Sequence, residues 1–140
     1  MTINIKNFLK DKAKLSKMGE FQNLKKIDGL EMASISADLY GDGRDDLTFF
    51  YFSKGANYAT LTTTNSITSE YISWNNNSHK KIIKGLFVNT KNANTFTGKQ
   101  GKESLDILAK NLSRILTIKE SKSQKGTTET VKIKDLIFAS

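Results

Sequence analysis

The sequence contains no cysteine, no proline and a single histidine among its 140 residues. Without cysteine the chain can form neither a disulfide nor a thiolate metal site, which fits a reducing compartment such as the cytoplasm. The lone histidine, His79, excludes a metal site built on two histidines. The longest apolar run, residues 82–88, is interrupted by Lys84 and falls far short of the ~20 residues that span a membrane. We therefore expect a cytoplasmic chain with no metal and no membrane partner.

Arginine is also scarce, and lysine supplies most of the positive charge behind the net charge of +8. The lysines gather in residues 6–26 and 119–134. Such a surface could contact nucleic-acid phosphates by counterion release. However, lysine lacks the bidentate fork of arginine, and no nucleic-acid motif or run of interleaved aromatic residues accompanies these lysines. A solvated surface is the simpler interpretation. A stand-alone lysine-rich binding or interaction module, with nucleic acid among its ligands, is the alternative function.

Apolar spacing predicts two helices. Residues 4–18 place Ile5, Phe8 and Leu9 near one side of a lysine-studded helix, within a basic N-terminal extension over residues 1–26. Residues 102–118 carry leucines, isoleucines and an alanine at steps of three and four, which is typical of a helix that packs on a sheet. The remaining residues, 27–140, are expected to form one α+β domain.

Strands are predicted between these helices. Residues 30–37 alternate and residues 47–52 are aromatic, and the Gly-Asp-Gly turn between them predicts an antiparallel hairpin. We expect a turn over residues 53–57 and a third strand over residues 58–63, which are rich in β-branched side chains. A short buried segment anchored by Trp74 should end in an exposed asparagine-rich loop. A polar loop over residues 120–130 should precede a final strand over residues 131–139.

The aspartates of the hairpin turn invite a calcium interpretation. Asp38, Asp42, Asp45 and Asp46 have part of the spacing of a calcium-binding loop. Tyr40 and Phe49, however, occupy the third and twelfth positions, where such a loop needs oxygen ligands. A tight acidic turn is the expected structure.

One segment carries a more specific signal. Residues 89–98 read Asn-Thr-Lys-Asn-Ala-Asn-Thr-Phe-Thr-Gly and follow an apolar strand directly. Asparagine and threonine side chains hydrogen-bond neighbouring backbone, so such a run can hold a fixed array of neutral polar groups. This segment resembles the signature loop of the ornithine acetyltransferase family, the bifunctional glutamate N-acetyltransferases of arginine biosynthesis. Residues 43–47, Gly-Arg-Asp-Asp-Leu, and residues 63–65, Thr-Thr-Asn, resemble two further family segments.

The resemblance covers residues 27–140 and implies an αββα sandwich, in which a mixed or antiparallel sheet is covered by helices. In the family, a threonine exposed by self-cleavage takes the acetyl group of N-acetylornithine and passes it to glutamate. The family's Thr-Gly oxyanion pair follows the strand that matches residues 136–140, and the nucleophile lies further on. The resemblance thus implies an N-terminal portion, an incomplete domain that is inactive alone and that pairs with a C-terminal half or a complementary chain.

The resemblance assigns no catalytic residue, metal or cofactor to these residues, although acetyl-coenzyme A is open as an acetyl donor in a full-length enzyme. Thr90 and Lys91 depart from the family's Ser-Gly. The loop residues either contact substrate or hold the loop through their own bonds to backbone. The residues expected beside the active site are Asn89, Asn92, Ala93, Asn94, Thr97 and Gly98.

Overall fold

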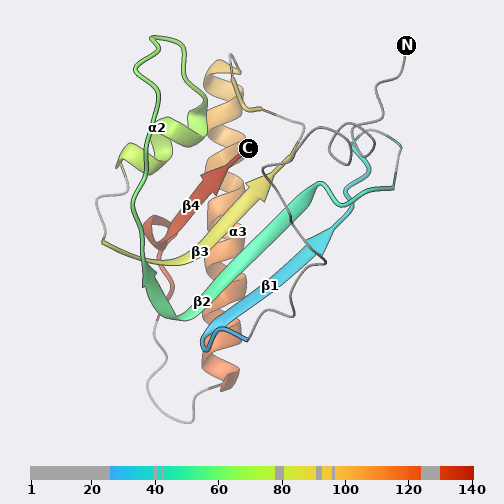
Figure 1. Ribbon diagram of the computed structural model, residues 1–140, viewed down its shortest axis with the longest axis vertical. Coiled ribbons are helices and arrows are strands. Elements are labelled where there is room, and N and C mark those ends of the chain that lie inside the picture. Colours follow the sequence, from blue (N-terminus) through green and yellow to red (C-terminus); the bar gives the residue numbers. More distant parts are fainter. Residues whose placement is uncertain are drawn as a thin grey trace, which may run out of the picture.

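The computed structural model describes residues 26–39, 41, 43–77, 81–90, 93–95, 97–123 and 130–140. The predicted helix over residues 4–18 lies outside these ranges. Within them, four strands form one sheet in the order β1-β2-β3-β4 (Figure 1). The elements are β1 (Leu30–Ile35), β2 (Leu47–Asn57), α2 (Glu70–Asn77), β3 (Ile82–Asn89), α3 (Gly98–Ser123), the 3-10 turn η1 (Ile133–Asp135) and β4 (Leu136–Ala139).

The sheet is mixed, as predicted. β1 pairs with β2 and β2 with β3 in antiparallel fashion, whereas β3 and β4 run parallel. The predicted hairpin of β1 and β2 is confirmed. The parallel pair forms because α3 crosses from the end of β3 to the start of β4, the connection that parallel strands require. The expectation of an α+β fold is therefore correct.

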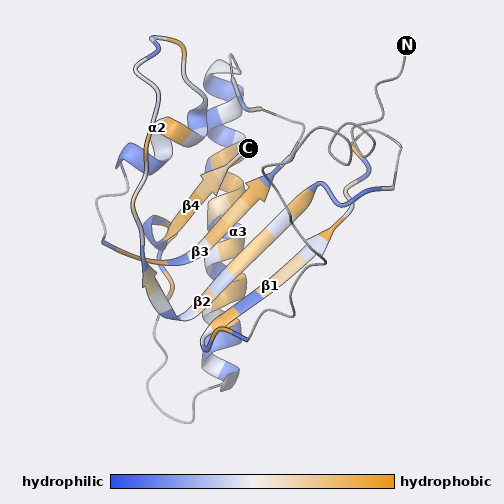
Figure 2. Cartoon of the chain, viewed as in Figure 1, coloured by the Kyte–Doolittle hydropathy of each residue, from blue (hydrophilic) through white to orange (hydrophobic). Residues whose placement is uncertain are grey.

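Helix α3 packs on one face of the sheet, behind the strands in Figure 1. Leu105, Ala109 and Leu116 recur on one side of α3 and are buried together with Tyr51 and Phe138 of the sheet. Each buried Leu or Phe side chain contributes about 1.5–3 kcal/mol of transfer free energy. Figure 2 shows the hydrophobic residues gathered on the strands and on the part of α3 behind them, with hydrophilic residues at both ends of α3.

The opposite face of the sheet is also apolar. The strand register aligns Met32, Phe50, Leu86 and Ile137 in one row across the four strands. Because side chains alternate between faces, this row points away from the one that includes Phe49, Phe87 and Phe138, which packs toward α3. At the β1 edge the row is open, with Met32 63% exposed. No described helix covers this face.

Two predictions, for residues 53–57 and 58–63, were wrong. The predicted turn over residues 53–57 is the second half of β2, and the predicted strand over residues 58–63 lies outside regular secondary structure. The register of β2 on β3 shifts between Tyr51 and Ala56, and Gly55 adopts a φ of +74° within this bulge. Glycine therefore marks a bulge here and not a turn. The β-branched residues that follow have no partner strand, and β-propensity reflects packing against neighbours.

The asparagine-rich loop is instead a helix. α2 extends through Asn77, and the side chain of Asn75 accepts a bond from Phe138 N (3.1 Å) and donates to Phe138 O (2.7 Å). Trp74 packs against the core, as predicted, and its indole N–H donates to Leu136 O at 3.0 Å. These two side chains occupy the backbone groups along the free edge of β4, so α2 takes the place of a fifth strand there.

The C-terminal boundaries also differ from the prediction. α3 continues to Ser123 because Glu120, expected in a polar loop, is buried against the sheet. The final strand begins only at Leu136. Val131 is buried instead by α3, where Ser113 donates to its carbonyl oxygen at 2.6 Å.

Candidate functional site

The loop that follows β3 and the residue that follows β4 leave the sheet at the same edge. Val88 and Ala139 are register partners in the parallel β3–β4 pair, so Asn89 and Ser140 emerge side by side (Figure 1). The carboxyl ends of neighbouring parallel strands are a common position for ligand sites, since loops converge there. The segment that resembles a family signature therefore begins beside the end of β4.

A buried aspartate holds the start of this loop. The backbone oxygen of Asp46 accepts bonds from Thr90 N (2.8 Å) and Thr90 Oγ1 (3.2 Å). Its carboxylate, in a residue only 2% exposed, accepts bonds from Ala37 N (2.7 Å) and Leu39 N (3.0 Å). Asp46 thus ties the hairpin turn to the loop. In the sequence Asp46 stands out only as part of the Gly-Arg-Asp-Asp-Leu segment and of the aspartate cluster in the turn, and its place just before a core strand was the available signal.

Further along, Asn94 joins the loop to both helices. Its backbone oxygen accepts a bond from Glu70 N at 3.0 Å, at the start of α2. Its Nδ2 donates to Gly101 O at 3.3 Å in the first turns of α3, and its Oδ1 accepts a bond from the Thr97 hydroxyl. Ser69 and Thr95 add a β-bridge between the same segments. The interactions of Asn94 are those of a loop held by its own bonds.

Two glycines shape the entry into α3. Gly98 begins the helix with a φ of +53°, a conformation that L side chains rarely adopt. Gly101 lies directly under the loop, and a Cβ atom at that position would overlap the Thr97 hydroxyl and the Asn94 side chain. The loop therefore rests on bare helix backbone.

The six predicted site residues are only partly brought together. Asn94, Thr97 and Gly98 lie at the start of α3, and Ala93 is exposed beside them. Asn89 is apart from this group, buried at the end of β3 as the register partner of Leu47. Asn92 lies outside the described residues.

A cavity of about 530 Å³ adjoins Asn94 and Thr97. Its other polar walls come from Tyr71 and from Gln100 and Ser104 in the first turns of α3. Every lining side chain is uncharged, so the cavity offers amide and hydroxyl groups to a small polar molecule without favouring an ion of either sign. This volume lies within the usual range of small-molecule sites.

The described ranges contain neither a candidate metal-ion cluster nor a candidate membrane-spanning helix. They contain no group of three or more His, Cys, Asp and Glu residues placed to hold a metal ion, although Tyr40, Asp42 and His79 fall outside them. No helix in that part of the chain has the length and apolar character needed to cross a membrane.

Comparison with known proteins agrees with the resemblance carried by the signature loop. The ArgJ family model matches residues 31–132. The chain belongs to the ArgJ family. It is 30% identical over 101 residues to the arginine biosynthesis bifunctional protein ArgJ of Bartonella quintana, which covers 71% of this chain and 24% of that protein. It is 34% identical over 80 residues to ArgJ of Zymomonas mobilis, covering 56% of this chain and 20% of that protein. The chain thus spans about a quarter or less of the curated ArgJ proteins it matches.

Solved structures show the same fold. ArgJ of Bacillus halodurans matches 80% of this chain and 53% of its own with a TM-score of 0.57 at 16% identity. Ornithine acetyltransferase of Mycobacterium tuberculosis, solved in complex with ornithine, matches 81% and 56% with a TM-score of 0.64 at 20% identity. The mixed four-stranded sheet with its two helices is therefore an ArgJ fold element.

Proposed function

We propose that these residues form the N-terminal part of an acetyltransferase of arginine biosynthesis that moves an acetyl group from N-acetylornithine to glutamate through a threonine acyl-enzyme. The observation that carries the proposal is the parallel pairing of β3 and β4, which brings the signature loop and Ser140 to one edge of the sheet. In the family that the signature loop resembles, a Thr-Gly oxyanion pair directly follows the strand that matches β4. Loop and oxyanion donors would then face the same reacting carbonyl.

In this arrangement the described residues act as scaffold and substrate wall. Preorganised donors at the developing oxyanion are each worth on the order of 3 kcal/mol of barrier, but only when they are held rigidly. Asp46 and Asn94 supply that rigidity: the backbone oxygen of Asp46 accepts bonds from Thr90, and the Asn94 side chain donates to Gly101 O. The nucleophile belongs, in the family order, to a segment beyond residue 140. Residues 1–140 alone are therefore expected to catalyse no transfer.

The apolar row of Met32, Phe50, Leu86 and Ile137 suggests where the remainder of the enzyme packs. An apolar sheet face favours burial against a second layer. We propose that the family's C-terminal half, continuous with these residues or supplied as a complementary chain, covers this row as the second sheet of the αββα sandwich. A cytoplasmic location is part of the proposal and is compatible with the cysteine-free sequence.

The test compares two proteins in an acetyl-transfer assay from N-acetylornithine to glutamate. One is residues 1–140 alone, and the other is the complete product, in which the C-terminal half follows in the same reading frame or is added as the complementary chain. We expect turnover by the complete product only. Turnover by residues 1–140 would refute the inactivity of this portion, and no transfer by the complete product would refute the proposed activity. Replacing N-acetylornithine by acetyl-coenzyme A in the same assay decides whether the cofactor can serve as donor.

A further inference from the structure

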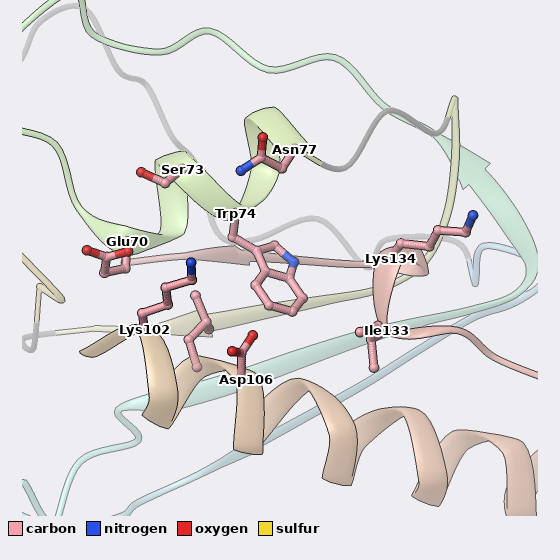
Figure 3. Close-up of a pocket in the computed structure, with 9 residues that line it drawn as sticks. Glu70, Ser73, Trp74, Asn77, Lys102, Asp106, Ile133 and Lys134 are labelled. Atoms are coloured by element: carbon pink, nitrogen blue, oxygen red, sulfur yellow. The ribbon is translucent and has the colours of Figure 1, made fainter. Parts of the chain in front are cut away.

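A second cavity, of about 490 Å³, lies between α2 and α3, with η1 along one side (Figure 3). The α2 wall is formed by Glu70, Ser73, Trp74 and Asn77, which follow one helix face at steps of three and four. The α3 wall repeats this spacing with Lys102, Leu105 and Asp106. The two helices thus present faces with the same residue spacing across an open cleft. The proposed acetyl transfer does not use this cleft.

The apolar part of the cleft is rigid. The Trp74 indole is fixed by its bond to Leu136 O and by an edge contact with Phe138, whose ring centroid lies 5.4 Å away at an interplanar angle of 90°. Leu105 beside it is 3% exposed. The Trp74 indole therefore offers most of the apolar surface, and it is already held in place before a ligand packs on it.

The charged groups at this surface carry both signs. Figure 3 shows Lys102 reaching up from α3 beside Glu70, and Asp106 turned toward the Trp74 ring. None of the Glu70, Lys102 or Asp106 side chains forms a hydrogen bond or ion pair with another described residue, so all three can pair with a ligand. Lys134 borders the cleft on the η1 side.

The charge balance indicates the class of ligand. Two carboxylates and two ammonium groups give the lining a formal charge of zero, in a chain whose net charge is +8. A polyanion such as nucleic acid gains nothing from a neutral cleft whose lining includes two carboxylates. A zwitterion satisfies both signs at once, and charge-assisted hydrogen bonds are the stronger kind.

We propose that this cleft binds a zwitterionic α-amino acid with an apolar or aromatic side chain. Its carboxylate pairs with Lys102, its ammonium group with Asp106, and its side chain packs on Trp74 beside Leu105. The volume of the cleft suits a ligand of this size. Because Glu70 N also donates to Asn94 O, an occupied cleft adjoins the backbone of the signature loop.

The single tryptophan of the chain makes the proposal directly measurable. Residues 1–140 are titrated with L-phenylalanine while fluorescence is excited at a wavelength absorbed by tryptophan only. N-acetyl-L-phenylalanine lacks the ammonium charge and L-phenylalaninamide lacks the carboxylate. We expect a saturable change in tryptophan fluorescence with the zwitterion. Each blocked analogue should bind about fivefold more weakly. No saturable change, or equal binding of the blocked analogues, overturns the proposal.

Variants locate the ligand within the cleft. Lys102→Gln and Asp106→Asn should each weaken binding about fivefold. Lys110→Gln removes an exposed charge from α3 at a position that does not line the cleft, and should leave binding unchanged. A loss with Lys110→Gln as large as that with Lys102→Gln would overturn the assignment in favour of general electrostatics. The readout is independent of acetyl transfer, so failure of the proposed enzymatic function does not affect it.

Discussion

The Nζ atom of Lys84 in β3 lies 3.1 Å from the Oε1 atom of Glu120 in α3, and the two side chains are only 12% and 3% exposed. The same carboxylate oxygen accepts a bond from the Tyr51 hydroxyl at 2.9 Å, and Lys84 also donates to Ser53 O at 2.9 Å. One buried ion pair therefore joins α3 to both β2 and β3. Burial of charge is costly unless every partner is present.

Removing one member of this pair should destabilise the fold strongly. Lys84→Met removes the ammonium group that lies 3.1 Å from the buried Glu120 carboxylate, and we expect the free energy of unfolding to fall by about 3–5 kcal/mol. The double variant Lys84→Met/Glu120→Leu should recover much of this loss, because no charge is then buried. Urea unfolding followed by circular dichroism measures both.

The matched control is the exposed ion pair of Lys99 and Glu103 on the same helix, with side chains 90% and 60% exposed. Lys99→Met should change the free energy of unfolding by no more than about 0.5 kcal/mol. If Lys84→Met cost no more than Lys99→Met, the pair would not hold α3 on the sheet.

Asn75 and its neighbour Asn76 provide a second contrast. Asn75→Ala removes both side-chain bonds to the Phe138 backbone and should cost about 2 kcal/mol, since the freed groups lie against the helix. Asn76 is exposed on the same helix, where alanine has the better helix propensity, so Asn76→Ala should be neutral or slightly stabilising. Thermal unfolding compares the two, and hydrogen exchange of the Phe138 amide should accelerate in Asn75→Ala only. Equal melting temperatures for the two variants would contradict the edge-capping role of Asn75.

Asn75 also shows why the sequence predicted some elements and not others. The β1–β2 hairpin and the core of α3 follow from local periodicity, because their side chains alternate or recur on one face. The second half of α2 does not, since asparagine is a poor helix former and only contact with β4, 63 residues away, satisfies its amide. Local patterns contain no information about such a distant partner.

The candidate site also has parts that the sequence predicted and parts that it did not. The signature loop was identifiable because its asparagines and threonines are contiguous in the sequence, within residues 89–98. Asp46 and Gly101 contribute as much to its geometry, yet each looks ordinary in sequence. Their importance comes from a backbone oxygen that meets Thr90 and from an absent Cβ atom beneath Thr97. The first relationship exists only once β2 and β3 are paired, and the second only once α3 begins at Gly98.

Asp28 provides a prediction about pH. The hydrogen bond from Lys54 (2.5 Å), aided by the charge of that lysine, holds the pKa of the Asp28 carboxyl below its ordinary value. Because the Asp28 pKa is lowered in the folded state, the ion pair stabilises the fold above the unfolded pKa of about 3.9. This stabilisation is lost as pH falls through the folded pKa.

Lys54→Gln should therefore raise the pKa of Asp28 in an NMR titration. Because both side chains are exposed, added salt should raise the Asp28 pKa in the parent chain and change it less in the Lys54→Gln variant. An Asp28 pKa that did not move on substitution would show that Lys54 is not its cause.

Gly101 allows the rigidity of the signature loop to be tested. Glycine within a helix normally costs about 1 kcal/mol relative to alanine, so Gly→Ala inside a helix is usually stabilising. At residue 101 the added Cβ would instead overlap the Thr97 and Asn94 side chains. We expect Gly101→Ala to destabilise the chain and to shift the NMR signals of the Asn94 side-chain amide, whose Nδ2 donates to Gly101 O. Gln100→Ala, on the same turn, adds no Cβ atom at residue 101 and should leave the Asn94 signals close to their parent positions. A stabilised Gly101→Ala with an unshifted Asn94 amide would mean that the loop does not rest on this turn of α3, and the bonds that hold the proposed substrate wall would have to lie elsewhere.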